Sequence, residues 1–408
     1  MNTIYADNNA TTRVAPEVIE AMAPFFAEDY FNPSSMYEPA RRTAHAVAQA
    51  RKTIADGLGG SDPKEILFTS CATESNNTAI IGTARGNPNR RHIITTAVEH
   101  PAVLEVCREM ERTGYQVTVL GVDGQGNLDL GDFVRALSPD TLLVSIMHAN
   151  NETGAIFPVD RLARITKETD PAIVFHTDAT QTVGKLPIDV TREFRYVDLL
   201  SFSGHKLHAP KGVGALFARR GARCRPFMLG GHQEEGRRGG TENVPYIIGL
   251  AKALQLCLAT REEDEARIGR LRDRLQGAME AKIPFVQVNG MGAPRLANTL
   301  NASVHYIEGE GILYQLSAQG ICASSGSACT SGSLEPSHVL RAMKVPFTAV
   351  HGSVRFSLSR YSTDAEVDRI IEVFPGIVDS LRKLSPYWDM QKNAPRPEAR
   401  NLPPPARR

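Results

Sequence analysis

A lysine and an aspartate stand at the ends of two apolar segments of this sequence. Lys206 comes just after the apolar run 197–202, with Ser203 and His205 beside it, and Asp178 ends another apolar run. Because ligands of open α/β sheets bind at the carboxyl ends of the strands, we expect the two side chains to share one site. The lysine amine can form a Schiff base there, and the carboxylate can keep a pyridine nitrogen protonated so that the ring accepts electrons. The pair indicates a pyridoxal phosphate (PLP) site, although taken singly Lys206 also fits a surface lysine and Asp178 a helix N-cap.

The turn Ser70–Thr73 is a candidate anion site. The apolar strand Ile66–Phe68 leads into this turn, and a helix follows it. The first N–H groups of a helix have no partner within the helix, and together with the helix dipole they favour a bound anion. The Thr73 hydroxyl adds a donor, so we expect a cofactor phosphate to bind here, although no glycine-rich signature marks the turn.

Cys329 lies in a run of small and polar residues, 323–333. No apolar side chain anchors this run, so we expect a mobile loop, on which a thiol is a candidate nucleophile. Cys322, beside Ile321, is expected to be a buried strand residue instead. Metal sites do not use the spacing of these two cysteines, so the pair predicts no metal site.

Strands alternate with helices over the first part of the chain. From residue 65 to 219, short apolar runs alternate with stretches that suit helices, which indicates βαβ units and a mostly parallel sheet. The runs are apolar on both faces, as expected when helices cover both sides of the sheet. The seven predicted strands are 65–69, 92–96, 116–120, 141–147, 172–176, 196–202 and 212–218.

A long amphipathic helix, Leu250–Lys282, is the predicted bridge to a smaller α/β domain. We expect a large domain at 15–255 and a small domain that combines 1–14 with 256–390. The tail, 391–408, is rich in proline and arginine and is expected to be disordered. The predicted elements of the small domain are strands 298–304, 320–323 and 353–358 and helices 309–319 and 364–384.

The balance of charges and the cysteine content exclude several classes of protein. The chain has 408 residues, with 46 Lys plus Arg against 45 Asp plus Glu, so no net field attracts nucleic acid or an anionic membrane. No apolar run approaches the roughly 20 residues that span a bilayer, and the N-terminus has no signal-peptide pattern. Six cysteines are too few for a disulfide scaffold, so we expect free thiols and a cytoplasmic location.

Five motifs together resemble the PLP-dependent cysteine desulfurases, a family of the class V aminotransferase superfamily. The resemblance covers residues 1–388 and implies the fold of type I PLP-dependent transferases, with a mostly parallel seven-stranded sheet covered by helices and a smaller α/β domain. Within this family, the segments GRRGGTENV, SGSACTSGSLEPSH and LRKLSPYW are most similar to those of the nitrogen-fixation (NifS-type) members. The five motifs are HANNETG (148–154), HTDATQ (176–181), SFSGHK (201–206), RGGTENV (238–244) and SSGSACTSGSLEPSHVLRAM (324–343).

The resemblance implies a role for each matching residue. Lys206 would hold the cofactor through a Schiff base, His100 would stack on its ring, and Cys329 would accept the sulfur. Asp178 would pair with the ring nitrogen, and Gln181 and Asn151 with the ring oxygen and nearby atoms. The implied phosphate ligands are Ala72, Thr73, Ser203, His205 and, from the second subunit of a homodimer, Thr241; Gly204 is a further implied cofactor-binding residue. Asn32 and Arg355 would hold the substrate carboxylate. Without the resemblance, His100 could simply cap the helix that begins at Pro101, and Arg355 could face solvent.

The implied activity converts L-cysteine to L-alanine and places the sulfur on Cys329 as a persulfide. The sulfur would then pass by thiol exchange to an iron–sulfur scaffold protein of the NifU type, for nitrogenase maturation. Cys329 could also ligate the scaffold's cluster transiently, as its only metal contact. A class V aminotransferase, which would leave Cys329 idle, and a selenocysteine lyase remain open alternatives. So does a thiol carrier or iron–sulfur scaffold, although one well-placed cysteine cannot hold a cluster unaided.

Overall fold

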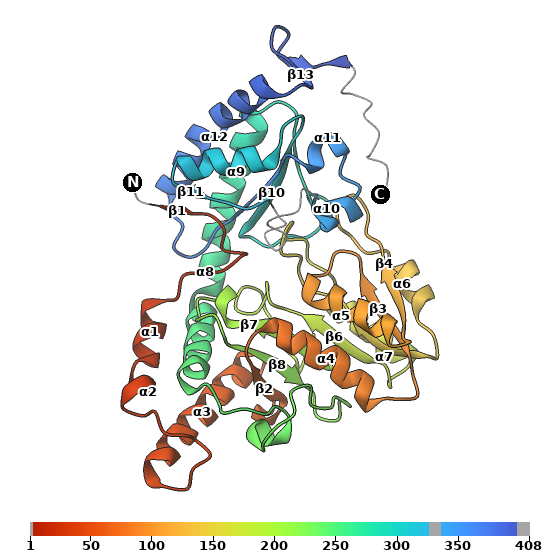
Figure 1. Ribbon diagram of the computed structural model, residues 1–408, viewed down its shortest axis with the longest axis vertical. Helices are drawn as coiled ribbons and strands as arrows, with labels where there is room; N and C mark the ends of the chain where they lie inside the picture. Colours follow the sequence, from red (N-terminus) through yellow and green to blue (C-terminus); the bar gives the residue numbers. More distant parts are fainter. Residues whose placement is uncertain (1–2, 326–335, 398–408) are drawn as a thin grey trace.

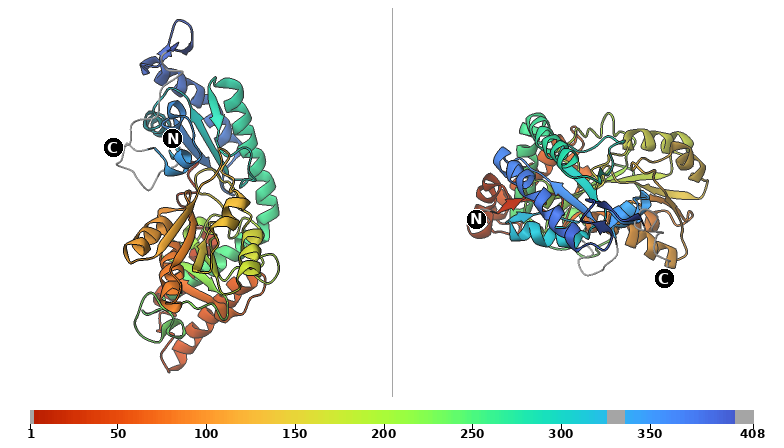
Figure 2. Two further views of the ribbon diagram at one scale, coloured as in Figure 1. Left: turned by 90° about the vertical axis from the view of Figure 1, so that its right-hand side faces the viewer. Right: turned by 90° about the horizontal axis from the view of Figure 1, so that it is seen from above.

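Figure 1 shows two packed units joined by one long helix, α8 (Val244–Lys282). The computed structural model describes residues 3–325 and 336–397. The first unit is a sheet with helices on both sides, and the second carries both the beginning of the described chain and its last elements (Figure 2). The mixture of sheet and covering helices confirms the predicted α/β class.

The large sheet has seven strands in the order β2-β8-β7-β6-β5-β3-β4. All pairings are parallel except those of β8, which runs antiparallel to β2 and β7. Each of the seven predicted runs forms one of these strands. Their bounds are β2 (Ile66–Thr69), β3 (His92–Thr96), β4 (Gln116–Leu120), β5 (Thr141–Ser145), β6 (Val174–Asp178), β7 (Leu199–Ser203) and β8 (Gly214–Ala218).

Successive residues of the central strands pack on opposite faces of this sheet. Leu143 and Leu199 belong to the core under α4 and α5, whereas Val144 and Leu200 belong to the core under α3 and α8. This alternation of two buried faces explains why the strands are continuously apolar. The helices of this unit are α1 (Pro16–Met22), α2 (Pro24–Ala27), α3 (Glu38–Gly57), α4 (Ala72–Gly86), α5 (Pro101–Arg112), α6 (Leu130–Ala136) and α7 (Val159–Thr169), with short 3-10 turns at η1 (Pro63–Glu65), η2 (Gly204–Lys206) and η3 (Gln233–Gly236).

The second unit has its own hydrophobic core on a three-stranded antiparallel sheet, β12-β10-β9. The N-terminal strand β1 pairs with β11 in this unit. The separate core of this unit agrees with a division into 15–255 and 1–14 plus 256–390, which we keep as a proposal, but Val339, Leu340 and Met343 of the second range pack into the core of the first unit. The elements are β1 (Ile4–Tyr5), β9 (Val286–Val288), β10 (Thr299–Val304), β11 (Ile321–Cys322), β12 (Ser353–Ser357), α9 (Gly309–Ala318), α10 (His338–Ala342), α11 (Phe347–Val350) and α12 (Asp364–Leu384).

Helix α8 begins six residues before the predicted start at Leu250, because Pro245 occupies its first turn, where a missing N–H costs nothing. Its first half packs on α1 and α3. Its second half contributes Ile268, Leu271 and Leu275 to the core of the second unit. No helix within the described ranges is long and apolar enough to cross a membrane.

The structure differs from the expectation of disorder at residues 391–397. Strand β14 (Ala394–Pro395) pairs with β13 (Trp388–Asp389), and the Arg396 N–H donates to the Tyr387 carbonyl at 2.9 Å. Trp388 anchors this hairpin, since its ring is buried and the Arg382 guanidinium lies 4.2 Å from its centre. Residues 398–408 lie outside the described residues.

Deleting residues 391–408 should therefore lower the melting temperature, whereas deleting only 398–408 should leave it unchanged. The longer deletion removes β14 and uncovers Trp388, at an expected cost of about 1–2 kcal/mol for the lost backbone hydrogen bonds. Thermal unfolding of the two truncated proteins beside the full chain measures this. Equal melting temperatures for the two truncations would show that the hairpin adds nothing to stability.

Candidate active site

A cavity of about 340 Å³ lies where the carboxyl ends of β6 and β7 meet the second unit. It holds Lys206 and Asp178 together, as expected from their positions after two strands. Strand β12 of the second unit adds Arg355 to the same wall. The lining residues are Asn9, Ala10, Cys71, Ala72, Thr73, Asn76, His100, Ala102, Met147, Ala149, Asn151, Asp178, Thr180, Gln181, Ser203, His205, Lys206 and Arg355.

Lys206 lies in the 3-10 turn η2, directly after β7. Its Nζ donates to the backbone carbonyls of Asn9 and Ala10, each at 2.6 Å. Gly204, at the start of this turn, packs so closely that a Cβ there would lie 3.0 Å from Ala209 and Leu250. The tight turn and the two carbonyls fix the amine at the cavity wall.

Asp178 is the last residue of β6 and is buried. Its Oδ2 accepts a hydrogen bond from Nδ2 of Asn76 at 2.7 Å, and its Oδ1 accepts the Thr180 N–H at 2.9 Å. The second bond closes the turn after the strand, so the carboxylate stabilises the local backbone as a cap would. The first bond comes from α4 and orients the carboxylate at the cavity.

Several buried polar atoms of the cavity wall have no hydrogen-bond partner among the described residues. They include the Ser203 hydroxyl, Nε of Arg355 and Oδ1 of Asn76. Buried polar atoms are almost always hydrogen-bonded, so such a group of orphans fits a site that receives a polar ligand. Helix α4 begins beside Ser203, at Ala72, and turns its first N–H groups to the same place. This end of the cavity therefore suits an anion.

His100 caps α5 and also lines the cavity. Its Nδ1 accepts the Ala102 N–H at 3.1 Å, which leaves the ring proton on Nε2. Burial lowers the pKa of His100. Burial and the charge of Lys206 lower the pKa of His205 to about 3. Both rings are therefore neutral at pH 7, and they add no positive charge beside Lys206.

Arg355 is fully buried and held in place by two acceptors. One terminal nitrogen donates to Oδ1 of Asp7 at 2.7 Å, and the other donates to the Asn151 carbonyl at 3.0 Å. The guanidinium thus has a fixed plane, with Nε still unpartnered among the described residues. A fixed guanidinium suits the recognition of a carboxylate. The expectation that Arg355 could face solvent is wrong.

The segment Asp7–Thr12 is a part of the site that sequence reasoning missed. Asn9 donates from Nδ2 to the Asn151 carbonyl at 3.0 Å and to the Thr299 hydroxyl at 2.8 Å. The Thr12 N–H and hydroxyl both bond to the His205 carbonyl. The run DNNATT is polar and directly follows a two-residue strand, and nothing in its local pattern indicates partners so distant in sequence.

Four predicted site residues are not among the residues that line this cavity. Asn32 is exposed between α2 and α3, where its side chain accepts the Ser34 N–H. Gly204 is buried at the start of η2 and does not line the cavity, and Thr241 is exposed. Cys329 lies outside the described residues. Within those residues, no group of three or more His, Cys, Asp and Glu side chains could hold a metal ion.

The loop that carries Thr241 is tied to the first unit by two ion pairs. Arg238 donates to Glu74, in the first turn of α4, at 2.9 Å. Arg51 of α3 pairs with the buried Glu234 at 2.6 Å. These contacts fix the loop and leave Thr241 exposed.

Comparisons with known proteins match nearly the whole chain. The profile of the family described as Aminotransferase class-V matches residues 4–370. The protein named "Cysteine desulfurase" of Trichormus azollae is 55% identical over 387 residues, 95% of this chain and 96% of that protein. "Cysteine desulfurase NifS" of Azotobacter vinelandii is 52% identical over 388 residues, again 95% and 96%.

Solved structures show the same similarity. The structure titled "NIFS-LIKE PROTEIN" superposes with a TM-score of 0.87 at 38% identity, over 93% of this chain and 100% of that one. The structure titled "SspA in complex with cysteine" superposes with a TM-score of 0.77 at 35% identity, over 88% and 100%. The fold and the sequence similarity therefore extend together over both units.

Glu99, the residue before His100 in the sequence, is a buried acid. It should make the free energy of unfolding depend on pH. Its carboxyl group accepts the Thr96 hydroxyl at 2.8 Å and the Met147 N–H at 2.9 Å, and burial raises its pKa from 4.5 to about 8. Between these values the folded protein keeps a proton that the unfolded chain has lost. The free energy of unfolding therefore falls as the pH rises.

Glu99→Gln should remove this dependence because the amide cannot ionise. We expect the variant to gain stability relative to the parent between about pH 5 and pH 8, as measured by urea unfolding at both values. Glu105→Gln, an exposed change on α5, is the control and should leave the slope unaltered. A Glu99→Gln protein with the parent's slope would mean that Glu99 is already ionised in the folded state.

Proposed function

We propose that Lys206 holds PLP and that Cys329 accepts the sulfur. The chain belongs to the class-V aminotransferase family and is one of its cysteine desulfurases. The overall change would be the reaction of L-cysteine with the enzyme thiol to give L-alanine and an enzyme persulfide. The observation that carries this proposal is the single cavity in which Lys206, Asp178 and Arg355 meet.

The residues of the cavity fit PLP. Its phosphate would bind the N-terminus of α4 at Ala72 and Thr73, the unpartnered Ser203 hydroxyl and His205. Asp178 would pair with the ring nitrogen, with Gln181 and Asn151 near the ring oxygen and His100 against the ring face. The bound cofactor supplies an electron sink that lowers the cost of breaking bonds at the substrate α-carbon.

The chain's own side chains would perform the remaining steps. Arg355 would bind the substrate carboxylate, because its plane is fixed and its Nε has no partner among the described residues. The Lys206 amine, at the same wall, would remove the proton from the α-carbon as a general base. The Cys329 thiolate would then attack the substrate sulfur, so that the carbon–sulfur bond breaks and a sulfur–sulfur bond forms. Protonation of the carbon releases alanine.

We further propose that the sulfur serves iron–sulfur cluster assembly, and in particular nitrogenase maturation through a scaffold protein of the NifU type. The support is the 52% identity with NifS of Azotobacter vinelandii. A cytoplasmic location agrees with the free state of the five described cysteines. If the protein were an aminotransferase, the segment SSGSACTSG (324–332) would have no role. A parallel assay with selenocysteine as the substrate tests the alternative of a selenocysteine lyase.

Cys329→Ala should keep the yellow cofactor and still bind L-cysteine, yet form no persulfide and release no alanine. The reason is that this thiol acts on substrate sulfur and not on the cofactor. Cys322→Ala is the matched control: Cys322 lies in β11 as expected, but it is partly accessible rather than buried. Its loss should leave activity within about twofold of the parent and cost little stability.

Peptide mass mapping after a single turnover locates the sulfur atom. A persulfide on Cys71, the one described cysteine that lines the cavity, would contradict the assignment of Cys329.

Thr241→Ala should weaken PLP retention roughly tenfold if Thr241 donates to a phosphate across a homodimer, as expected for a hydrogen bond to a charged group. A mixed dimer of Thr241→Ala and Lys206→Ala subunits tests this. One of its two sites would combine an intact Lys206 with an intact Thr241 from the partner. We expect that site to retain PLP as tightly as the parent. Retention no better than in the Thr241→Ala homodimer would place Thr241 at its own subunit's site.

A further inference from the structure

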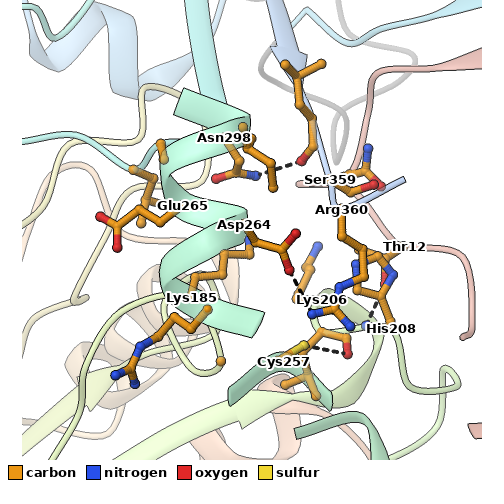
Figure 3. Close-up of a pocket in the computed structure, with 18 of the residues that line it drawn as sticks. Thr12, Lys185, Lys206, His208, Cys257, Asp264, Glu265, Asn298, Ser359 and Arg360 are labelled. Carbon is orange, nitrogen blue, oxygen red and sulfur yellow. Dashed lines mark hydrogen bonds and ion pairs between the residues drawn. The ribbon is translucent and has the colours of Figure 1, made fainter. Parts of the chain in front are cut away.

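A second, smaller cavity lies on the far side of Lys206. It has a volume of about 70 Å³ and is bounded by the turn after β6, by α8 and by the segment after β12. Figure 3 shows Lys185, Cys257 and Asp264 around it, with Lys206 behind them. Lys206 lines both cavities, whereas Gln181 lines only the larger and Lys185 only the smaller. Gln181 and Lys185 thus form part of the wall between the two cavities.

These side chains are linked by hydrogen bonds. Lys185 Nζ donates to Oε1 of Gln181 at 3.3 Å. Nε2 of Gln181 donates to the Asn9 carbonyl at 3.1 Å, and that carbonyl also accepts from Lys206 at 2.6 Å. The link therefore leads from Lys185, through a predicted cofactor ligand, to the backbone that holds the catalytic lysine.

The two ends of this link allow one orientation of the Gln181 amide. A lysine amine at Oε1 is a donor, and the Asn9 carbonyl at Nε2 can only accept. If the amide turned over, its NH₂ group would face the Lys185 donor and its oxygen would face the carbonyl oxygen of Asn9. In the orientation observed, one N–H of Gln181 is used by Asn9 and the second is available to a ligand in the larger cavity.

We propose that Lys185 is a positioning residue that fixes the Gln181 amide so that its NH₂ group faces the oxygen substituent of the PLP ring. The inference rests on the proposed function, because it takes PLP as the ligand. Gln181 is buried, and Oε1 has no described partner besides Lys185. Loss of the amine would leave a buried oxygen unpaired and leave the Asn9 carbonyl as the one described contact that still orients the amide.

The position of Lys185 suits this role at any pH in the working range. No carboxylate pairs with it within hydrogen-bond distance among the described residues. Burial and the charge of Lys206 lower its pKa to about 7. The neutral amine still carries hydrogens, so both forms can donate to Oε1. The lysine therefore sets the amide without placing a permanent second charge beside Lys206.

The test is a double-mutant cycle on the PLP-loaded enzyme with Lys185→Met, Gln181→Ala and the double variant. The readouts are the visible absorption band of the bound cofactor and the rate of PLP release into an excess of a trapping protein. Lys185→Met should shift the band and speed release roughly three- to tenfold, the range of one buried hydrogen bond. In the Gln181→Ala background the same change should alter release by less than about twofold, because the lysine acts through the amide.

Two further variants complete the design. Lys185→Arg retains a donor to Oε1 and should keep the parent's rate of PLP release, whereas its permanent charge beside Lys206 makes its absorption band no test of the hydrogen bond. Lys252→Met removes a partly buried lysine of α8 that lines neither cavity and should also behave as the parent. If the methionine variant does not fold, an arginine variant that releases PLP about threefold faster than the parent, or more, overturns the proposal.

Equal effects of Lys185→Met with and without Gln181 would also overturn it, since the lysine would then act by another route. An unchanged band and release rate in Lys185→Met would do the same. A parent protein that binds no PLP would contradict the proposed function itself, whereas a yellow, active parent with an unaffected Lys185→Met would reject only this inference.

Discussion

The candidate site depends on one polar segment, Asp7–Thr12, which runs between the two hydrophobic cores. Asp7 holds the Arg355 guanidinium, which β12 brings from the second unit. The carbonyls of Asn9 and Ala10 hold the Lys206 amine, which β7 brings from the first. Because both sets of contacts come from residues at most three positions apart in one segment, that segment sets the separation of the lysine and the arginine. The contacts of this one segment therefore determine both the relative position of the two units and the geometry of the cavity.

Burial sets the charge state around the lysine. The neighbouring histidines, His100 and His205, are neutral because burial lowers their pKa values, and Glu99 keeps its proton because burial raises its pKa. The hydrogen bonds that remain are directional: an amide orients Asp178, and a carboxylate orients Arg355. A ligand entering this cavity meets groups that are already oriented, which is how a protein avoids reorganisation when it binds.

The sheet was predictable because its central strands are short runs buried on both faces, with helix-compatible stretches between the earlier ones. Lys206 and Asp178 could be placed in one site for the same reason, since both directly follow or end such strands. The antiparallel course of β8 was not predicted, although only residues 204–213 separate it from β7, fewer than the dozen or so that a parallel crossover needs. Asn9 and Asn76 were missed because each contacts a residue more than 100 positions away in the sequence, which no local pattern identifies. Thr241 and Asn32 were placed only by resemblance, and the single chain leaves both away from the cavity.

Borohydride reduction of the PLP-loaded protein, followed by peptide mass mapping, tests the central claim most directly. Reduction fixes the cofactor on whichever amine carries it. We expect one pyridoxyl group per chain, on the peptide that contains Lys206, and none on the peptide that contains Lys185, the lysine of the adjoining cavity. Label on Lys185, or no label on Lys206, would contradict the assignment of the cavity and the roles derived from it.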